Sequence, residues 1–221
     1  MVIDFWERVM KLGNVLIIGD SYSTFEGFIP QGYACCYKLD PCFADVDCVE
    51  KTWWWQVINA LDGKLLLNDS WSGSTICHTG YNGQDRSDNS FVARLNNYLQ
   101  QGYFNDNTPD TVFVFGGTND NWAGSPLGQV EYSGWTKQTL YSFFPALACL
   151  LDSLQKGLPN ANVYVIINTD LKKELVEGVK TICNHYGIKF IELNGIQKVN
   201  GHPDALGMRQ LASQVISGLS K

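Results

Sequence analysis

The chain has 221 residues, of which 45% are hydrophobic, 13% are aromatic and only 17% are charged. Low charge together with many aromatic side chains excludes an intrinsically disordered chain. The formal net charge of −6 disfavours a partner with a phosphate backbone, so we expect no nucleic-acid binding. No apolar run approaches the roughly 20 residues that span a bilayer, so we expect no membrane insertion.

The first 20 residues do not have the pattern of a signal peptide, because Asp4 and Glu7 interrupt the apolar residues and no small-residue cleavage site follows. We therefore expect a cytoplasmic protein, or a secreted protein from which a signal peptide has been removed. The 7 cysteines lack CxxC spacing, which argues against a zinc site or a disulfide framework. Four of them lie in one segment, where a local disulfide or metal site is the alternative to ordinary thiols: Cys35, Cys36, Cys42 and Cys48.

Short β-branched runs alternate with segments of helical periodicity along the whole chain. In chain order we expect a strand over 14–19, a helix over 51–61, a strand over 64–68, a helix over 90–100, a strand over 111–115, a helix over 136–155, a strand over 162–167, a helix over 171–186, a strand over 188–192 and a helix over 203–219. We expect Pro145 to kink or break its helix, Gly187 to end the fourth helix, and Pro203 to occupy the first turn of the last one.

Alternating strands and helices predict an α/β protein with a parallel sheet that is covered on both faces. The expected architecture is a flavodoxin-like three-layer αβα sandwich with a five-stranded parallel sheet, formed by a single domain over residues 1–221. Residues 23–50 show little periodicity and exceed an ordinary βα turn in length. We expect this segment to carry function or to pack as an ordered loop.

Polar residues follow the strands at the edge of the sheet where open parallel sheets bind their ligands. Ser21 follows the first strand, Gly73 the second, Asn119 the third, and His202 the fifth. A serine beside a histidine can act as an activated nucleophile. A glycine N–H and an asparagine amide can donate to a developing oxyanion.

Four short blocks around these residues stand in order and span residues 19 to 203: GDSY at 19–22, SGST at 72–75, GGTND at 116–120 and GHP at 201–203. They resemble the blocks of the SGNH hydrolases, also called GDSL-type lipases and esterases. The resemblance implies the fold of that family, with Ser21 as nucleophile and His202 as base. It also implies an oxyanion hole formed by the Ser21 N–H, the Gly73 N–H and the Asn119 side chain, without a cofactor or a metal.

The sequence departs from the family pattern at two positions. Tyr22 replaces the leucine of GDSL, and Val199 stands where the family places an aspartate three residues before the histidine. Three groups could orient the histidine instead: a backbone carbonyl, Asn200, or a carboxylate from elsewhere. The candidates for such a carboxylate are Asp170 and Glu192. We predict a Ser-His dyad.

Residues next to these four are candidates for a loop that meets the substrate: Asp20, Tyr22, Thr118 and Asp120. Purely structural roles are the alternative for the central residues. Ser21 could cap a helix, Gly73 could serve a tight turn, Asn119 could bond its own backbone in a turn, and His202 could only begin a helix.

The remaining aromatic and histidine residues have mainly structural interpretations. His185 lies in the last turn of a helix, where a cation suits the dipole, and His78 is a loop residue near the site. Trp53, Trp54 and Trp55 cannot share one helix face, so at least one should be buried and at least one partly exposed. A sugar-stacking surface is the alternative for these tryptophans.

The sequence thus predicts a serine ester hydrolase that cleaves short-chain acyl esters, including O-acetyl groups on carbohydrates, with a small-molecule or carbohydrate ester as its partner. A lysophospholipase or thioesterase, and a catalytically impaired glycan-binding module, are the alternatives. A flavodoxin-like nucleotide binder is disfavoured, because the chain lacks both GxxxxGK and GxGxxG.

Overall fold

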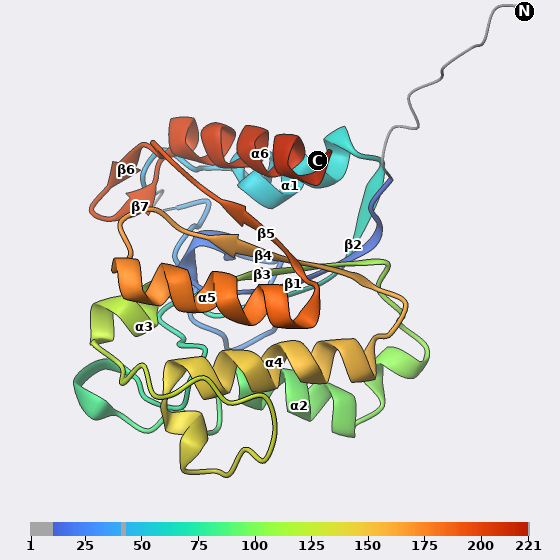
Figure 1. Ribbon diagram of the computed structural model, residues 1–221. Helices are drawn as coiled ribbons and strands as arrows, with labels where there is room; N and C mark the ends of the chain where they lie inside the picture. The colour runs from blue at the N-terminus through green and yellow to red at the C-terminus, as the bar shows by residue number, and fades with distance from the viewer. Residues whose placement is uncertain (1–10, 41–42, 221) are drawn as a thin grey trace, which may run out of the picture.

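Five short apolar strands lie side by side in one parallel sheet, in the order β2-β1-β3-β4-β5 (Figure 1). The computed structural model describes residues 11–40 and 43–220. The strands are β1 (Gly13–Gly19), β2 (Gly63–Ser70), β3 (Thr111–Phe115), β4 (Asn162–Ile167) and β5 (Lys189–Glu192). Each of the five expected strands is therefore present, and the predicted parallel sheet is confirmed.

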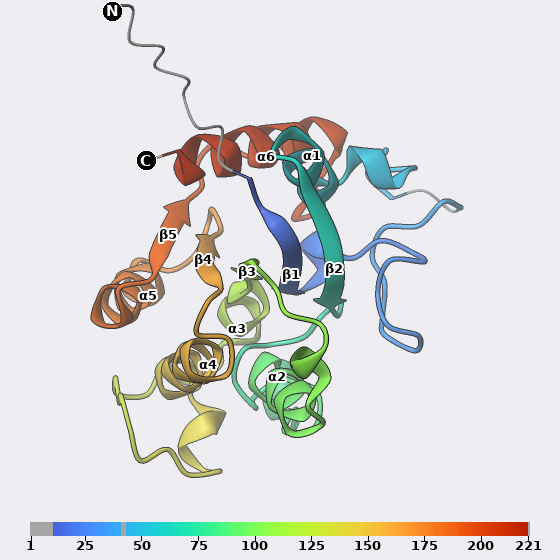
Figure 2. The same cartoon turned by 90° about the vertical axis from the view of Figure 1, so that its right-hand side faces the viewer.

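Helices cover both faces of this sheet, which confirms the predicted three-layer αβα sandwich (Figures 1 and 2). One layer holds α1 (Trp53–Ala60) and α6 (Ala205–Leu219), and the other holds α2 (Phe91–Gln100), α4 (Phe143–Gly157) and α5 (Lys173–Tyr186). The short helix α3 (Thr118–Ala123) and a hairpin of β6 (Lys198–Val199) and β7 (His202–Pro203) lie together at one end of the sheet (Figure 1). Single-turn 3₁₀ helices complete the fold: η1 (Ser21–Ser23), η2 (Val49–Lys51), η3 (Tyr81–Gly83), η4 (Tyr103–Asn105) and η5 (Thr139–Tyr141).

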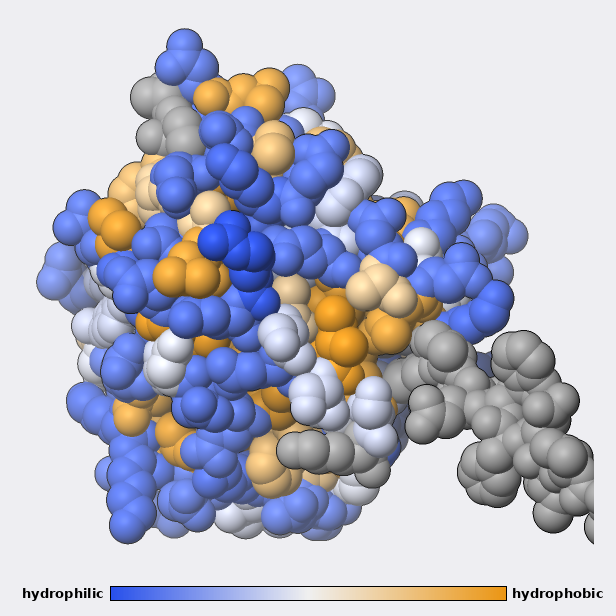
Figure 3. Space-filling view, turned by 90° about the horizontal axis from the view of Figure 1, so that it is seen from above, coloured by the Kyte–Doolittle hydropathy of each residue, from blue (hydrophilic) through white to orange (hydrophobic). Residues whose placement is uncertain are grey.

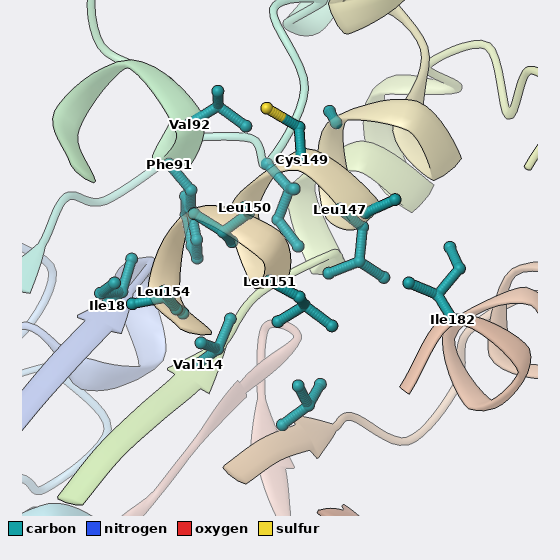
Figure 4. Packing of buried hydrophobic residues seen from close by; sticks show 14 of the residues in the cluster. Ile18, Phe91, Val92, Val114, Leu147, Cys149, Leu150, Leu151, Leu154 and Ile182 are labelled. Carbon is teal, nitrogen blue, oxygen red and sulfur yellow. The ribbon is translucent and has the colours of Figure 1, made fainter. Parts of the chain in front are cut away.

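The strands bury both of their faces, because successive side chains point into opposite helical layers. Ile18 and Val114 pack against α2 and α4 in one hydrophobic cluster (Figure 4). Ile17 and Phe113 pack in a second cluster on the α1 and α6 side. This explains why the strands read as continuous apolar runs in the sequence.

Two predictions about proline were wrong in position. The expected helix over 136–155 begins only at Phe143, so Pro145 lies in the first turn of α4, where a missing N–H leaves no intrahelical bond unmade. Pro203 belongs to β7, and α6 begins after Asp204, whose Oδ1 accepts from the Gly207 N–H at 2.8 Å. Gly187 does end α5, with a φ of 64°.

The aromatic residues of the N-terminal half are mostly core. Trp53 and Trp54 are fully buried, whereas Trp55 is partly exposed, as the helix geometry predicts. The buried pair cannot form a sugar-stacking surface, so that alternative is wrong for these two residues. Residues 23–50 pack as an ordered loop over the described part, with Phe25 and Tyr37 buried in the α1 and α6 cluster.

The described cysteines are free thiols: Cys35, Cys36, Cys48, Cys77, Cys149 and Cys183. Cys42 lies outside the described residues. So do residues 1–10, the first half of the segment that lacks the pattern of a signal peptide. The face of the molecule over α1 and α6 is mostly hydrophilic with scattered apolar side chains (Figure 3). Among the residues that the structure describes, none of the helices is long and apolar enough to cross a bilayer.

A buried ion pair joins α2 to the ends of the two strands that lead into the serine and glycine loops. Arg94 of α2 donates from Nε to Asp69 Oδ2 at 3.0 Å, and both side chains are almost completely buried. Its Nη2 donates to the carbonyls of Asp69 and Gly19, each at 3.2 Å. The guanidinium also lies over the Phe91 ring, 4.9 Å from its centroid. One side chain therefore fixes β1 and β2 relative to each other where both strands end.

We expect Arg94→Met to lower the free energy of unfolding by roughly 3–5 kcal/mol, because the Asp69 carboxylate would stay buried without its cation. Urea unfolding followed by circular dichroism measures this change. Adding Asp69→Asn to Arg94→Met should restore part of the loss, since it removes the unpaired charge. Lys11→Met is the matched control, because it breaks an exposed pair with Asp62 and should leave stability unchanged. Equal effects of Arg94→Met and Lys11→Met would contradict the structural role of the buried pair.

Candidate active site

The loop after β1 places Ser21 at the carboxyl end of the central strands. Gly19 closes the strand at a position where a Cβ would lie 2.5 Å from the Ser70 Oγ, so only glycine fits there. Asp20 then caps η1, and its Oδ1 accepts from the Tyr22 N–H at 3.1 Å. This tight turn holds the Ser21 hydroxyl in a fixed direction.

The structure brings His202 to Ser21 from the far end of the chain. His202 Nε2 lies 3.0 Å from the Ser21 Oγ. On the other side of the ring, Nδ1 lies 3.2 Å from the backbone carbonyl oxygen of Asn200. Since a carbonyl only accepts, Nδ1 carries the proton and Nε2 is left to accept from the serine hydroxyl.

Neither proposed carboxylate reaches this histidine. Asp170 forms an ion pair with Lys198 at 3.0 Å, and Glu192 forms one with Lys180 at 2.9 Å. Val199 lies on β6 and is 41% exposed. Of the three alternatives that the sequence left open, the structure selects the backbone carbonyl.

Asn119 and the glycine turn after β2 lie next to each other, because the Asn119 side chain bonds to the residue that follows Gly73. Gly73 has a φ of 81°, which favours glycine, and the space where a Cβ would stand is open. Asn119 lies in the first turn of α3, and its Nδ2 donates to the Ser74 carbonyl at 3.0 Å. The Tyr81 hydroxyl donates to Asn119 Oδ1 at 2.7 Å, which fixes the orientation of the amide.

Three donors at this edge remain available for a bound group. The backbone N–H groups of Ser21 and Gly73 donate to no acceptor among residues 11–40 and 43–220. The second hydrogen on Asn119 Nδ2 is likewise not used by the bond to Ser74. Backbone N–H groups and an asparagine amide are the kinds of donor that stabilise an oxyanion, so these three groups suit acyl transfer through a tetrahedral intermediate.

The four residues weighed for the substrate loop use their side chains to hold the framework. Asp120 accepts from the Ile76 and Cys77 N–H groups at 2.9 and 3.1 Å. The Thr118 hydroxyl accepts from Asn168 at 2.9 Å. The Tyr22 hydroxyl donates to the Gly201 carbonyl, and Asp20 caps η1 as described above.

Burial raises the pKa of both carboxyls in this framework. The pKa of Asp20 rises to about 7, and that of Asp120 rises to about 6. Oδ2 of Asp20 is buried without a hydrogen-bond partner, which fits a carboxyl that readily keeps its proton. For His202, burial lowers the pKa, the bond to Asn200 opposes this, and the nearby Lys198 lowers it further.

The other two histidines stand outside the pair. His78 is buried, with Nδ1 2.8 Å from the Ser90 Oγ at the start of α2. His185 lies in the last turn of α5 and stacks on Tyr132 with ring centroids 3.5 Å apart. No cluster of three or more His, Cys, Asp or Glu side chains with metal-binding geometry occurs among the described residues.

Sequence reasoning missed several residues that the fold adds to this site. Tyr81 was not selected, although it holds Asn119. Two aromatic rings stand edge-on to His202: Phe43 with centroids 5.6 Å apart and Trp122 with centroids 5.8 Å apart. Trp122 stands two residues after the GGTND block, so its place in the sequence was the one signal available.

Comparison with known proteins agrees with this geometry. A family model described as GDSL-like lipase/acylhydrolase matches residues 13–219. A solved structure from Bacteroides ovatus, described as a GDSL-like lipase, is 45% identical with a TM-score of 0.88, and the match covers 95% of this chain and 99% of that one. A second such structure, from Bacteroides uniformis, is also 45% identical with a TM-score of 0.88, and covers 95% of this chain and 96% of that one.

More distant structures share the fold. A family two carbohydrate esterase from Clostridium thermocellum, solved with cellohexaose, is 17% identical with a TM-score of 0.62, over 94% of this chain and 63% of that one. Among curated protein sequences, none matches the chain. Since the family match spans nearly all of the described residues, the chain belongs to the GDSL-like lipase/acylhydrolase family and is a hydrolase of ester bonds.

Proposed function

We propose that this protein is a serine esterase in which Ser21 and His202 act as a catalytic dyad. The observation that carries the proposal is the contact of 3.0 Å between Ser21 Oγ and His202 Nε2, together with the Asn200 carbonyl 3.2 Å from Nδ1. A carboxylate normally fixes the tautomer of such a histidine and stabilises the imidazolium. Here the carbonyl fixes the tautomer, and its partial negative charge does the stabilising.

The proposed reaction has two matched halves. Ser21 Oγ attacks the acyl carbon while its proton moves to His202 Nε2, and the carbonyl π electrons move onto the oxygen. That oxyanion accepts from the Ser21 and Gly73 N–H groups and from Asn119 Nδ2. When the tetrahedral intermediate collapses, the ester C–O bond breaks and the alcohol leaves with the proton from His202. Water then attacks the acyl-serine in the same way and releases the carboxylic acid.

We propose short acyl esters of carbohydrates as the substrates. His202 protonates the leaving alcohol, so the alcohol part of the ester lies on the side of the site where Trp122 stands. Trp122 is 43% exposed, which is unusual for so large an apolar side chain. An indole beside the leaving group can cover the C–H face of a sugar ring.

A stacked aromatic pair includes Trp71, which stands two residues before Gly73. Tyr33 and Trp71 stack with centroids 4.2 Å apart, and both are partly exposed. This stacked pair and the exposed Trp122 indole offer flat aromatic surfaces, which favour a substrate with ring systems over a single long acyl chain. The fold shared with carbohydrate esterases is consistent with this choice of substrate.

We expect Ser21→Ala to abolish labelling by a fluorophosphonate probe and to lower kcat on p-nitrophenyl acetate by more than about 10³-fold, because it removes the nucleophile. The control is Ser220→Ala, which removes a hydroxyl at the exposed end of α6. Turnover that survives Ser21→Ala would contradict the dyad. Glycan binding by a protein that neither turns over esters nor takes the label would identify a binding module instead.

We expect Tyr81→Phe to lower kcat roughly five- to tenfold with little change in KM, because the Asn119 amide loses the bond that orients it toward the oxyanion. Asn119→Ala should cost more, about 10² to 10³ in kcat, because it removes the donor itself. Tyr132→Phe serves as the control, since its ring stacks on His185 in the last turn of α5. Equal kinetics in Tyr81→Phe and the wild type would contradict this role.

We expect Trp122→Ala to raise KM for acetylated xylo-oligosaccharides roughly five- to tenfold through loss of an aromatic contact. It should change KM for ethyl acetate much less, because that alcohol is too small to reach the indole, and any loss from the Trp122 contact with His202 should appear in kcat on both substrates. Trp135→Ala is the matched control on a distant loop. A profile over acyl chains from acetyl to decanoyl tests the other half of the proposal. Highest activity on the long acyl chains would favour a lipase or thioesterase. The same conclusion would follow if Trp122→Ala left KM for the sugar esters unchanged.

A further inference from the structure

The hairpin that carries His202 is too small to hold its own position. It pairs only Lys198 with Pro203 and Val199 with His202. Its turn residues Asn200 and Gly201 have positive φ angles of 49° and 79°, as tight hairpin turns require. Because an isolated two-stranded hairpin is at best marginally stable in water, the site depends on anchors outside it.

Two tyrosines anchor the turn and β7 from the α1 side of the sheet. The Tyr22 hydroxyl donates to the Gly201 carbonyl, and the Tyr37 hydroxyl donates to the Pro203 carbonyl at 2.8 Å. Gly201 also allows Trp122 to lie against the turn, since a Cβ there would stand 3.1 Å from the indole. These contacts hold β7, but none of them holds β6.

Lys198 supplies the side-chain anchor for β6, next to the bond of 2.7 Å from the Gln197 N–H to Gln210 Oε1 on α6. Its Nζ lies 2.6 Å from the Thr169 Oγ1, 3.0 Å from the Asp170 Oδ2 and 3.4 Å from the Asn168 Oδ1. These three residues form the loop that follows β4, so each hydrogen of the ammonium group has an acceptor there. The same Nζ lies 5.6 Å from the centroid of the Tyr22 ring.

The value of these contacts is geometric more than energetic. The Asp170 side chain is 79% exposed, and such ion pairs add little to stability. The Lys198 side chain is only 13% exposed. The loop after β4 that binds it is in turn joined to α3, because Asn168 donates to the Thr118 hydroxyl. One lysine therefore connects β6, the end of β4 and the ring of Tyr22, all next to the dyad.

We propose that Lys198 is a positioning residue that replaces the missing triad carboxylate in function, by clamping the hairpin so that the Asn200 carbonyl and Ser21 hold the two nitrogens of His202. The proposal rests on the dyad proposed above. The carboxylate that the family places beside the histidine would fix the ring directly. Here Asp170 affects the His202 ring only indirectly, by holding Lys198 and with it the hairpin.

The ammonium also keeps a positive charge beside the histidine, which favours the neutral ring that can act as base. The rings that meet His202 directly are uncharged at neutral pH: Tyr22, Phe43 and Trp122. The charged or titratable side chains on the elements around it are Lys198 on β6, Asp204 after β7, Asp20 before η1, Asp120 on α3, and Asp45 on the loop bonded to the Ala205 N–H. Of these, Lys198 lowers the pKa of His202.

The test compares Lys198→Met with Lys180→Met, which breaks a similar surface pair with Glu192 far from the dyad. We expect Lys198→Met to lower kcat on p-nitrophenyl acetate by at least about tenfold with KM within a factor of two, because small displacements of catalytic groups are costly. Lys180→Met should match the wild type. Lys198→Arg should recover most of the rate, since it keeps the charge and the donors.

The pH profile separates positioning from simple stabilisation. Loss of the ammonium removes a charge that disfavours the imidazolium, so the pKa of His202 rises and the acid limb of kcat/KM moves to higher pH. Asp170→Asn keeps the ammonium and should not move the limb upward, although it loosens the clamp. An NMR titration of His202 in the Ser21→Ala background gives the same pKa without turnover.

The outcomes are distinct. If folded Lys198→Met matches the wild type in kcat and in the pKa of His202, the proposal is wrong, whatever the change in melting temperature. If Lys198→Met does not fold, Asp170→Asn decides, and an unchanged kcat in that variant would overturn the clamp. If the wild type itself shows no turnover and takes no fluorophosphonate label, the dyad fails first.

Discussion

The Arg94 guanidinium is the contact on which the rest of the structure depends. It holds the carbonyls of Gly19 and Asp69 at the points where β1 and β2 end, and neutralises the buried Asp69 carboxylate. The positions of the serine loop and the glycine turn depend on these two strand ends. Ser21 stands two residues beyond Gly19, and the glycine turn follows Ser70 directly, so a shift of either strand would separate the nucleophile from its oxyanion donors.

Around that fixed edge, the site is assembled from short segments that have little stability of their own. Asn119 stands on a helix of 6 residues, and His202 stands on a strand of 2 residues. Such segments keep their place only through side-chain contacts from neighbours. Tyr81 holds the amide, while Tyr22, Tyr37 and Lys198 hold the hairpin. The excess of aromatic residues in the composition is thereby partly explained, because several of them serve as scaffolding for the dyad.

The sequence predicted the layers of the fold well, because buried parallel strands must be apolar on both faces and therefore stand out as continuous runs. It was less accurate where one residue type permits two placements. A proline such as Pro145 is compatible with a break inside a helix and also with the first turn of one. Pro203 is compatible with the start of a helix and also with a short strand that precedes the N-cap residue. At α6 the Asp204 side chain caps the first turn, whereas α4 begins at Phe143 without a side-chain bond from Ser142.

By itself, the sequence determined the αβα architecture, the order of the four blocks and the residues that the strand ends would present. Strand periodicity and glycine-rich turns are local properties, so they can be read from adjacent residues. Only the tertiary structure decided what orients His202, since the partner is a backbone carbonyl that every residue possesses. It also decided that Asp170 pairs with Lys198 and that Trp122 borders the site. These contacts join segments that are distant along the chain, and no local pattern encodes them.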